Sequence, residues 1–360
     1  MRAAITQEST TGADPLRRLA AEGWLAALLP REDGGAGRSV TEVAAALADA
    51  FTARGDGGLA LAWAGHTLGC ALPIARLGAD AQRRRLLPGL AAGATLGAWA
   101  HHEVGVVGEA LGLRTYARRT PQGWVLDGRK VQVVNAGRAD LFLVTAITDP
   151  GRGPAGVSAF LVARGAAGLG VRGEAGPAAA ALGEVSLTEV HVPEDMILGA
   201  PGDGLGRAFR LVQRWERGLA AAPWLGLLRA GLAHAAAQAR TQVRLGAPLA
   251  RSQAHRARLA DAAIRLALCE RVQARAASLL DGGDLDLDPA GDLELASGRL
   301  FLGESIAWLA RELARLGEPA TLAADHPSAR LAADVAAAGL VGVPQEVLRS
   351  IVAAALTGLG

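Results

Sequence analysis

Glu216 is the side chain whose setting most favours acid–base chemistry. It lies in an apolar segment that is rich in small residues, with Trp215 and Trp224 nearby. Burial among apolar groups disfavours the charged form of a carboxylate and raises its pKa, as a general base at neutral pH requires. The alternative is a structural role, in which Glu216 forms an ion pair with Arg217, Arg214 or Arg240. The sequence leaves both interpretations open.

A second group of ionisable residues, His101, His102 and Glu103, raises the question of a metal site. This part of the chain has the pattern of a strand, and neighbouring side chains of a strand point to opposite faces. The two histidines therefore cannot bind one ion together, and we expect no metal site here. One imidazole should face inward and the other outward.

The elements that must position these side chains follow from the periodicity of the apolar residues. Residues 15–93 have helical spacing, the segment from about 96 to 198 alternates with a period of two, and the rest is helical again. Around Glu216 we expect one long helix, a turn at 245–248 and a second helix. The sequence predicts an α+β chain with an N-terminal helical domain, a middle β-barrel or sandwich of about seven strands, and a C-terminal four-helix bundle. The expected domains are residues 1–94, 95–203 and 204–360.

Composition excludes several classes of protein. The chain has 360 residues, a formal net charge of +2 and a single Tyr, which disfavours nucleic acid as a partner. We expect no signal peptide in the polar first 14 residues and no apolar run long enough to span a membrane. Cys70 and Cys269 lie in separate apolar stretches without metal-ligand spacing, as expected of buried thiols in a reducing cytoplasm.

The C-terminal half also carries a family pattern. Arg217 on the central helix is followed by Leu-Gly-Ala-Pro-Leu at 245–249, then by Gln253 and by Leu-Ala-Asp at 259–261. The N-terminal segment has Gly-Trp at 23–24, Leu-Pro at 29–30, Gly-Gly-Ala-Gly at 34–37 and Leu-Pro-Gly-Leu at 87–90. In these positions and in its order of helix, β and helix, the chain resembles the acyl-CoA dehydrogenases over nearly its whole length.

The resemblance implies oxidation of a thioester at its α and β carbons, with a Glu as the base and FAD as the hydride acceptor. Most members of the family place this Glu before the last helix, where the present chain has Val341. A minority similar to isovaleryl-CoA dehydrogenases places it on the central helix, one residue before an Arg, which corresponds to Glu216 and Arg217. Glu346 is the nearest alternative carboxylate to the usual site.

The positions that would border FAD differ from the family pattern. Here the resemblance implies His102, Gln132, Val134, Gln242 and Gln253 as cofactor-binding residues, although His102 replaces a Thr, Val134 replaces another Thr, and Gln242 replaces an Arg that reaches a neighbouring subunit's cofactor. Loss of that charge would remove a contact of about 1.5–3 kcal/mol. His102 is also the candidate for a second acid–base group. Arg217, Trp99 and Gly108 are expected at the substrate.

Three functions are consistent with these residues. The first is an FAD-dependent dehydrogenase of CoA-bound or carrier-protein-bound acyl groups, expected in secondary metabolism and as a homo-oligomer or with a related subunit. The second is an enzyme of the same fold without flavin, in which Glu216 and His102 catalyse proton transfer in a cyclisation, isomerisation or elimination. The third is a non-catalytic partner subunit, because fold resemblance alone does not establish activity.

Overall fold

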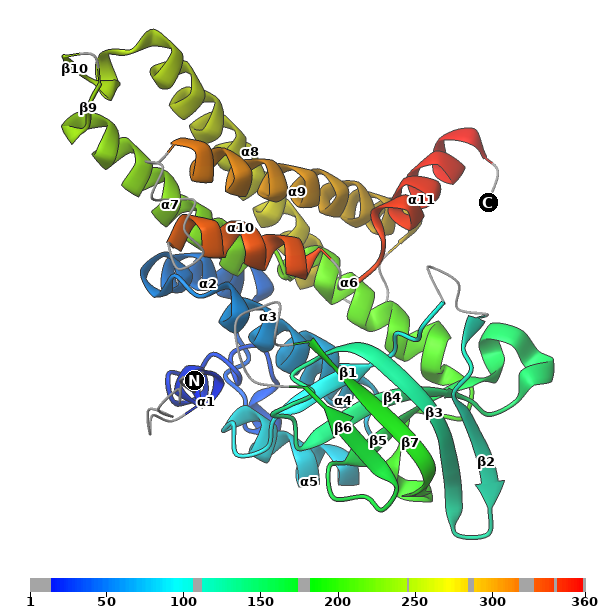
Figure 1. The fold of residues 1–360 in the computed structure, drawn as a ribbon. Helices are drawn as coiled ribbons and strands as arrows, with labels where there is room; N and C mark the ends of the chain where they lie inside the picture. Colours follow the sequence, from blue (N-terminus) through cyan, green and yellow to red (C-terminus); the bar gives the residue numbers. More distant parts are fainter. Residues whose placement is uncertain are drawn as a thin grey trace, which may run out of the picture.

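The fold is given by a computed structural model, which describes residues 14–105, 112–173, 182–244, 246–283, 288–316, 327–339 and 342–358. Figure 1 shows a helical N-terminal part, a twisted sheet and a long helical bundle. This order confirms the predicted α+β class and its three-part arrangement. The polar segment 1–13, for which we expected no signal peptide, lies outside the described residues.

The N-terminal part is a set of helices packed around a common apolar core. Its first helices begin at side chains that cap a helix N-terminus. The Asp14 carboxylate accepts a hydrogen bond from the Leu16 amide, and Ser39 forms a capping box with Glu42. The helices are α1 (Pro15–Ala21), α2 (Val40–Arg54), α3 (Gly57–His66), a π-helical turn (Thr67–Ala71), α4 (Leu72–Leu77) and α5 (Asp80–Ala91).

The run Gly57–Leu77 corrects the expectation that no segment is long enough to span a membrane. It has 21 residues and a mean hydropathy of 1.3 over its most apolar window, so it is long and apolar enough to cross a membrane. However, 89% of this window is buried inside the protein. The run is a core helix, and its apolar character reflects packing on several sides.

Among the described residues, the middle part is one sheet of eight strands, close to the expected number of about seven. Its neighbours follow the order β6-β7-β3-β2-β4-β5-β8, and β1 pairs in parallel with β4. The inward residues form a separate apolar core, which includes Trp124, Phe142 and Phe160. The strands are β1 (Gly97–Ala100), β2 (Tyr116–Thr120), β3 (Gly123–Val134), β4 (Leu141–Ile147), β5 (Val157–Ala163), β6 (Leu169–Arg172), β7 (Leu182–Pro193) and β8 (Ile197–Leu198).

The C-terminal part is a bundle whose first helix is interrupted, contrary to the prediction of one long helix. A π-helical turn (Gly204–Phe209) leads into α6 (Arg210–Leu219), and α7 (Ala222–Thr241) begins after a break at Ala220 and Ala221. Pro223 lies in the first turn of α7, where its missing N–H is tolerated, whereas inside a continuous helix it would break the hydrogen-bond ladder. The remaining elements are β9 (Val243–Arg244), β10 (Ala247–Pro248), α8 (Gln253–Asp281), α9 (Pro289–Leu316), α10 (Pro327–Ala338) and α11 (Gln345–Thr357).

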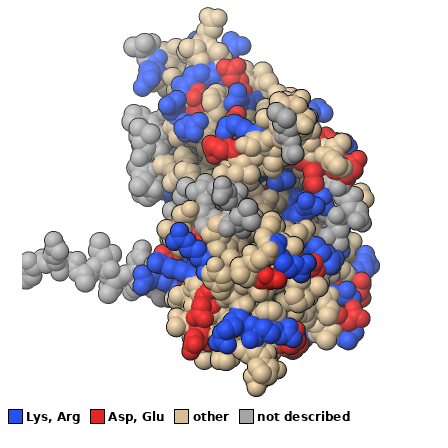
Figure 2. Space-filling model, turned by 90° about the vertical axis from the view of Figure 1, so that its right-hand side faces the viewer, with Lys and Arg blue, Asp and Glu red and all other residues tan. Residues whose placement is uncertain are grey.

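Contacts between the two helical parts fix the bundle over the N-terminal helices. Helix α2 packs against α7 and α8, and α10 packs against α9 and α3 (Figure 1). The Asp281 carboxylate at the end of α8 accepts hydrogen bonds from the Val40 and Thr41 amides, at 2.5 and 3.0 Å, at the start of α2. On the face shown in Figure 2, basic and acidic side chains are interspersed, in keeping with the small net charge.

Candidate active site

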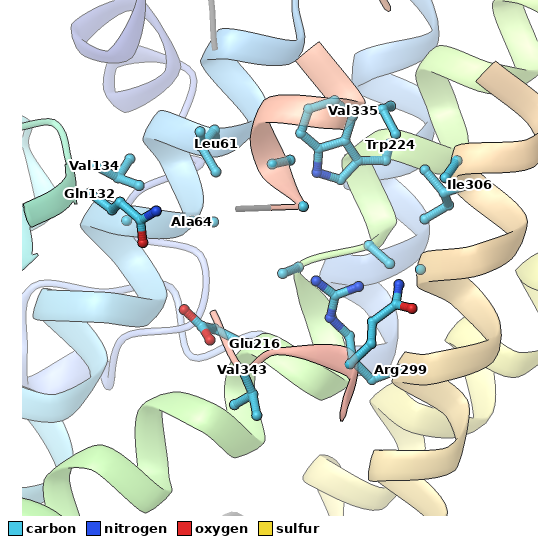
Figure 3. Close-up of a pocket in the computed structure, with 18 of the residues that line it drawn as sticks. Leu61, Ala64, Gln132, Val134, Glu216, Trp224, Arg299, Ile306, Val335 and Val343 are labelled. Carbon is cyan, nitrogen blue, oxygen red and sulfur yellow. The ribbon is translucent and has the colours of Figure 1, made fainter. Parts of the chain in front are cut away.

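A cavity of about 220 Å³ lies where the helices of both ends of the chain meet the sheet. Its walls come from α3 and the following π-turn, from β1 and β3, and from α6, α7, α9, α10 and α11. Most of the lining is apolar or small, including Leu61, Ala64, Ile306 and Val335 (Figure 3). Segments distant in sequence therefore combine to enclose one largely apolar space, the usual form of a small-molecule site.

Glu216 is the only carboxylate among the described residues that line this cavity. It projects from α6 into the space between β3 and α9 (Figure 3). Burial raises the pKa of Glu216 to about 7, against the lowering effects of the Arg299 and Arg217 charges. The carboxylate is therefore partly ionised near neutral pH and can accept a proton.

The neighbours of Glu216 on α6 are engaged elsewhere, so the structural ion pairs considered for it are not formed in the described residues. Arg214 makes a two-point ion pair with Asp292 of α9, at 2.8 and 2.6 Å. Arg217 donates to Gln213 at 2.9 Å, and Arg240 is exposed on α7. Arg217 contributes to the electrostatics of Glu216 but is not among the residues that line the cavity, where we expected it at the substrate.

Gly342 approaches the Glu216 carboxylate on the side of the last helix. Its φ is 87°, and a Cβ at this position would lie 3.1 Å from Glu216 Oε2. Both the backbone conformation and the close approach favour glycine. Val341, the position of the usual family base, lies outside the described residues. Glu346 is exposed and interacts with Arg349, which agrees with a surface position.

Arg299 and Gln345 also line the cavity, and neither residue was expected there from the sequence. Arg299 comes from α9 and Gln345 from the first turn of α11, and the Arg299 side chain points into the cavity (Figure 3). Burial lowers the pKa of Arg299, while the Glu216 charge opposes this. The helical pattern of α9 predicts its apolar face, but it contains no signal that an arginine of this face meets a carboxylate of α6.

The sheet contributes Trp99, His102, Gln132 and Val134 to the opposite wall. Strand β3 has a register shift between Lys130 and Val133, and Gln132 has a φ of 53°. A bulge of this kind redirects a side chain at the cost of backbone strain, commonly beside a functional site. The sequence predicted that these residues lie together, but not the bulge that turns Gln132.

The two histidines occupy different environments. His101 is buried, stacks on Trp99 with ring centroids 5.3 Å apart, and shares a 2.8 Å hydrogen bond with Thr145. His102 faces the cavity, and burial, followed by the charge of Lys130, lowers its pKa. His102 is therefore neutral at neutral pH, so that one ring nitrogen donates and the other accepts. The described residues contain no group of three metal-ligating side chains.

The remaining predicted site residues lie away from this cavity. Gln242 ends α7 and Gln253 begins α8, beside the β9–β10 turn at the end of the bundle remote from the sheet (Figure 1). Neither glutamine is among the described residues that line this cavity, and their role in cofactor binding remains a prediction. Gly108, expected at the substrate, lies outside the described residues.

The donor set of the sheet wall fits the ring of a flavin. Trp99 and Val134 give an apolar surface, while His102 and Gln132 each offer a donor and an acceptor. The pyrimidine edge of a flavin likewise presents carbonyl oxygens and an N–H group. These four residues would hold the ring on the side of the cavity that faces Glu216.

Family models match three successive parts of the chain. Residues 2–94 match the acyl-CoA dehydrogenase N-terminal domain, residues 99–190 the middle domain and residues 202–357 the C-terminal domain. An L-prolyl-[peptidyl-carrier protein] dehydrogenase of Pseudomonas fluorescens is 33% identical over 286 residues, which cover 78% of this chain and 74% of the relative. A glutaryl-CoA dehydrogenase of Desulfococcus multivorans is 27% identical over 94% of this chain and 87% of its own.

Solved structures share the fold over almost the whole chain. The prolyl acyl carrier protein oxidase AnaB has a TM-score of 0.88 at 23% identity, covering 94% of this chain and 89% of its own. A glutaryl-coenzyme A dehydrogenase in complex with glutaryl-CoA has a TM-score of 0.87 at 26% identity, covering 97% and 88%. These likenesses agree with the sheet and bundle described above.

Proposed function

Because the chain belongs to the acyl-CoA dehydrogenase family, whose cofactor is FAD, we propose that it oxidises an acyl thioester at the α and β carbons, with Glu216 as the base. The observation that carries this proposal is the cavity carboxylate itself. Glu216 is the one acidic side chain of the described lining, and burial raises its pKa to about 7. A base with this pKa suits removal of an α proton, which the thioester carbonyl acidifies.

Residues on the helical wall and on the sheet wall of the cavity have different roles. Glu216 removes the α proton from the helical side, and Arg299 balances the charge of the carboxylate. Trp99, His102, Gln132 and Val134 hold the flavin ring from the sheet side. When FAD is bound, it supplies the acceptor for the hydride that leaves the β carbon. Apolar side chains of α3, α7 and α10 line the space between the two walls and limit its solvation.

The relatives guide the choice of substrate carrier. Two of them act by name on acyl groups bound to a carrier protein or to CoA. We propose that the substrate of this chain is likewise a carrier-bound acyl thioester and that the reaction belongs to secondary metabolism. The buried free thiols of Cys70 and Cys269 support a cytoplasmic setting. Assembly with identical or related subunits is part of the same proposal.

The test measures flavin binding by the visible spectrum and catalysis by the reduction of an electron acceptor. The purified protein is mixed with FAD and desalted, and its visible spectrum is compared with that of the protein alone. Acyl thioesters of CoA and of pantetheine are then supplied with an artificial electron acceptor. We expect a retained flavin band and reduction of the acceptor with at least one thioester.

Two outcomes would contradict this function. A colourless protein that exchanges the α proton of a thioester with solvent would favour the non-redox alternative, in which Glu216 and His102 transfer protons. A colourless and inactive protein that becomes active only with a related subunit would favour the partner-subunit alternative. In both alternatives the chain has the same cavity, but it does not itself transfer electrons from the substrate to a flavin.

A further inference from the structure

Two hydrogen-bond donors converge on one side of the cavity. A Cβ placed on Gly303 of α9 would lie 3.3 Å from Arg299 Nη1 and 3.3 Å from Gln345 Nε2. The guanidinium and the amide nitrogen therefore border the same small space, and the glycine leaves that space open. Gly303, Arg299 and Gln345 all line the cavity.

The orientation of Gln345 is fixed from outside the cavity. Its Oε1 accepts a hydrogen bond from Arg349 at 3.2 Å, and Arg349 is itself paired with Glu304 at 2.6 Å. Since the oxygen of the amide is engaged by Arg349, the NH₂ group is the end that faces Gly303. Gln345 thus presents a donor next to the guanidinium.

No protein acceptor uses these donors in the described residues. Arg299 makes no hydrogen bond or ion pair there, and its interaction with Glu216 is purely electrostatic. An arginine with unused N–H groups in a largely apolar space is costly unless a ligand supplies the acceptor. A planar guanidinium beside an amide N–H matches the two oxygens of a carboxylate.

We propose that Arg299 and Gln345 form a binding site for a carboxylate carried by the acyl group of the substrate. The inference rests on the proposed function and specifies it: the preferred substrate is a dicarboxylic acyl thioester, with its free carboxylate on Arg299 and its α carbon at Glu216. The same arginine disfavours an acyl group that bears a cation at this end, because like charges repel in a poorly solvated space.

The test measures equilibrium binding to the flavin-loaded full chain by calorimetry. The ligands are analogues of the pantetheine thioesters of succinate, glutarate and adipate in which NH replaces the thioester sulfur. Each is compared with the analogue whose acyl group has the same length and ends in a methyl group. Amides are chosen because their α protons are less acidic than those of thioesters, so binding is separated from turnover. We expect one dicarboxylic ligand to bind about ten- to hundredfold tighter than its methyl-ended partner.

Variants assign the preference to the two donors. Arg299→Met should abolish the preference while leaving the affinity for the methyl-ended ligand within about twofold, which also shows that the cavity is intact. Gln345→Ala should reduce the preference by a smaller factor of about two to ten, as expected for a neutral donor. Arg311→Met is the matched control, since Arg311 is an exposed arginine of the same helix, and it should retain the full preference.

The outcomes separate this inference from the function on which it rests. If wild-type protein binds the methyl-ended and dicarboxylic ligands equally, or if Arg299→Met keeps the preference, the carboxylate site is wrong and the dehydrogenase function stands. If the wild-type protein binds neither class of ligand, both the function and the carboxylate site are contradicted.

Discussion

At the scale of single residues, the site depends on a carboxylate and a guanidinium held in one apolar space. Glu216 and Arg299 face the same cavity, and each opposes the effect of burial on the pKa of the other. Neither makes a hydrogen bond to the other in the described residues. The charged form of each group is therefore less stable in the protein than in water. A substrate that supplies the missing interactions would bind more tightly for this reason.

A first prediction concerns the pH dependence of stability. The pKa of Glu216 is about 7 in the folded protein against an ordinary value of 4.5, so the folded state binds the proton more tightly. Its contribution is fully present below about pH 4.5 and is lost as the pH rises through 7. Relative to Glu216→Gln, the wild-type protein should lose about 2–3 kcal/mol of unfolding free energy across this window.

The measurement is urea unfolding of both proteins at several pH values. The exposed Glu346→Gln variant is the control, and its stability should follow the wild type at every pH. A constant difference between wild type and Glu216→Gln from pH 4.5 to 7 would show that Glu216 does not carry the raised pKa.

Some residues of the site can be recognised from the sequence, and others cannot. Glu216 and His102 could be selected because their types and flanking residues already suggest a buried acid–base group. Arg299 and Gln345 could not, because their importance arises from the packing of α9 and α11 against α6, which local patterns do not encode. The family resemblance places Arg217 at the substrate. Its side chain contacts Gln213 and is not part of the described cavity lining, so this role stays a prediction.

At the scale of elements, α6 is positioned by its contact with α9. The pair between Arg214 and Asp292 joins the two helices, and the Arg214 side chain is only 5% exposed. A second two-point pair, Arg275 with Glu294, links α8 to α9 but is well exposed on both sides. Because the two ion pairs have similar geometry but differ in burial, breaking the buried pair should reduce stability more than breaking the exposed pair.

The second prediction follows from this contrast. Asp292→Asn leaves a buried guanidinium with a weakened partner and should lower the unfolding free energy by about 2–4 kcal/mol. Glu294→Gln should lower it by less than about 1 kcal/mol, because water replaces the lost contact. Both are measured by denaturant unfolding, and equal losses in the two variants would contradict the assigned role of burial. Turnover should fall only in Asp292→Asn, since this pair positions the helix of Glu216.

The periodicity of the sequence predicted the type of most elements but not their interruptions. The break between α6 and α7 depends on Pro223, whose presence in the first turn of a new helix could have been recognised. The bulge at Gln132 carries no comparable signal, because a positive φ at a glutamine is imposed by its surroundings.

At the scale of the whole molecule, the three-part order was predictable because each part has its own periodicity and the family signatures occur along the chain. The division at about residues 94 and 203 stays a prediction. The bundle also has an apolar outer face: Ile264, Leu268 and Phe301 are 60, 49 and 39% exposed, and they border a second hollow with Trp308. Exposed apolar groups gathered on one face are typical of a subunit interface.

The third prediction is that this face joins subunits. The double variant Ile264→Glu and Leu268→Glu should shift the protein to a smaller oligomer in sedimentation analysis, because buried carboxylates oppose association. Leu356→Glu, which alters an exposed apolar residue of α11 outside this face, should leave the assembly unchanged. If wild-type protein sediments as a monomer, or if the double variant keeps the wild-type assembly, the interface is not at this face.

The role of Glu216 as the base is tested by a single turnover without oxygen. The flavin-loaded protein is mixed with an acyl thioester that the wild type oxidises, and the loss of flavin absorbance is followed. The wild type and the exposed Glu346→Gln control should bleach at the same rate. Glu216→Gln should retain its flavin and bind the ligand, yet bleach about 10²- to 10⁴-fold more slowly. Bleaching of Glu216→Gln at the wild-type rate would show that Glu216 is not the base.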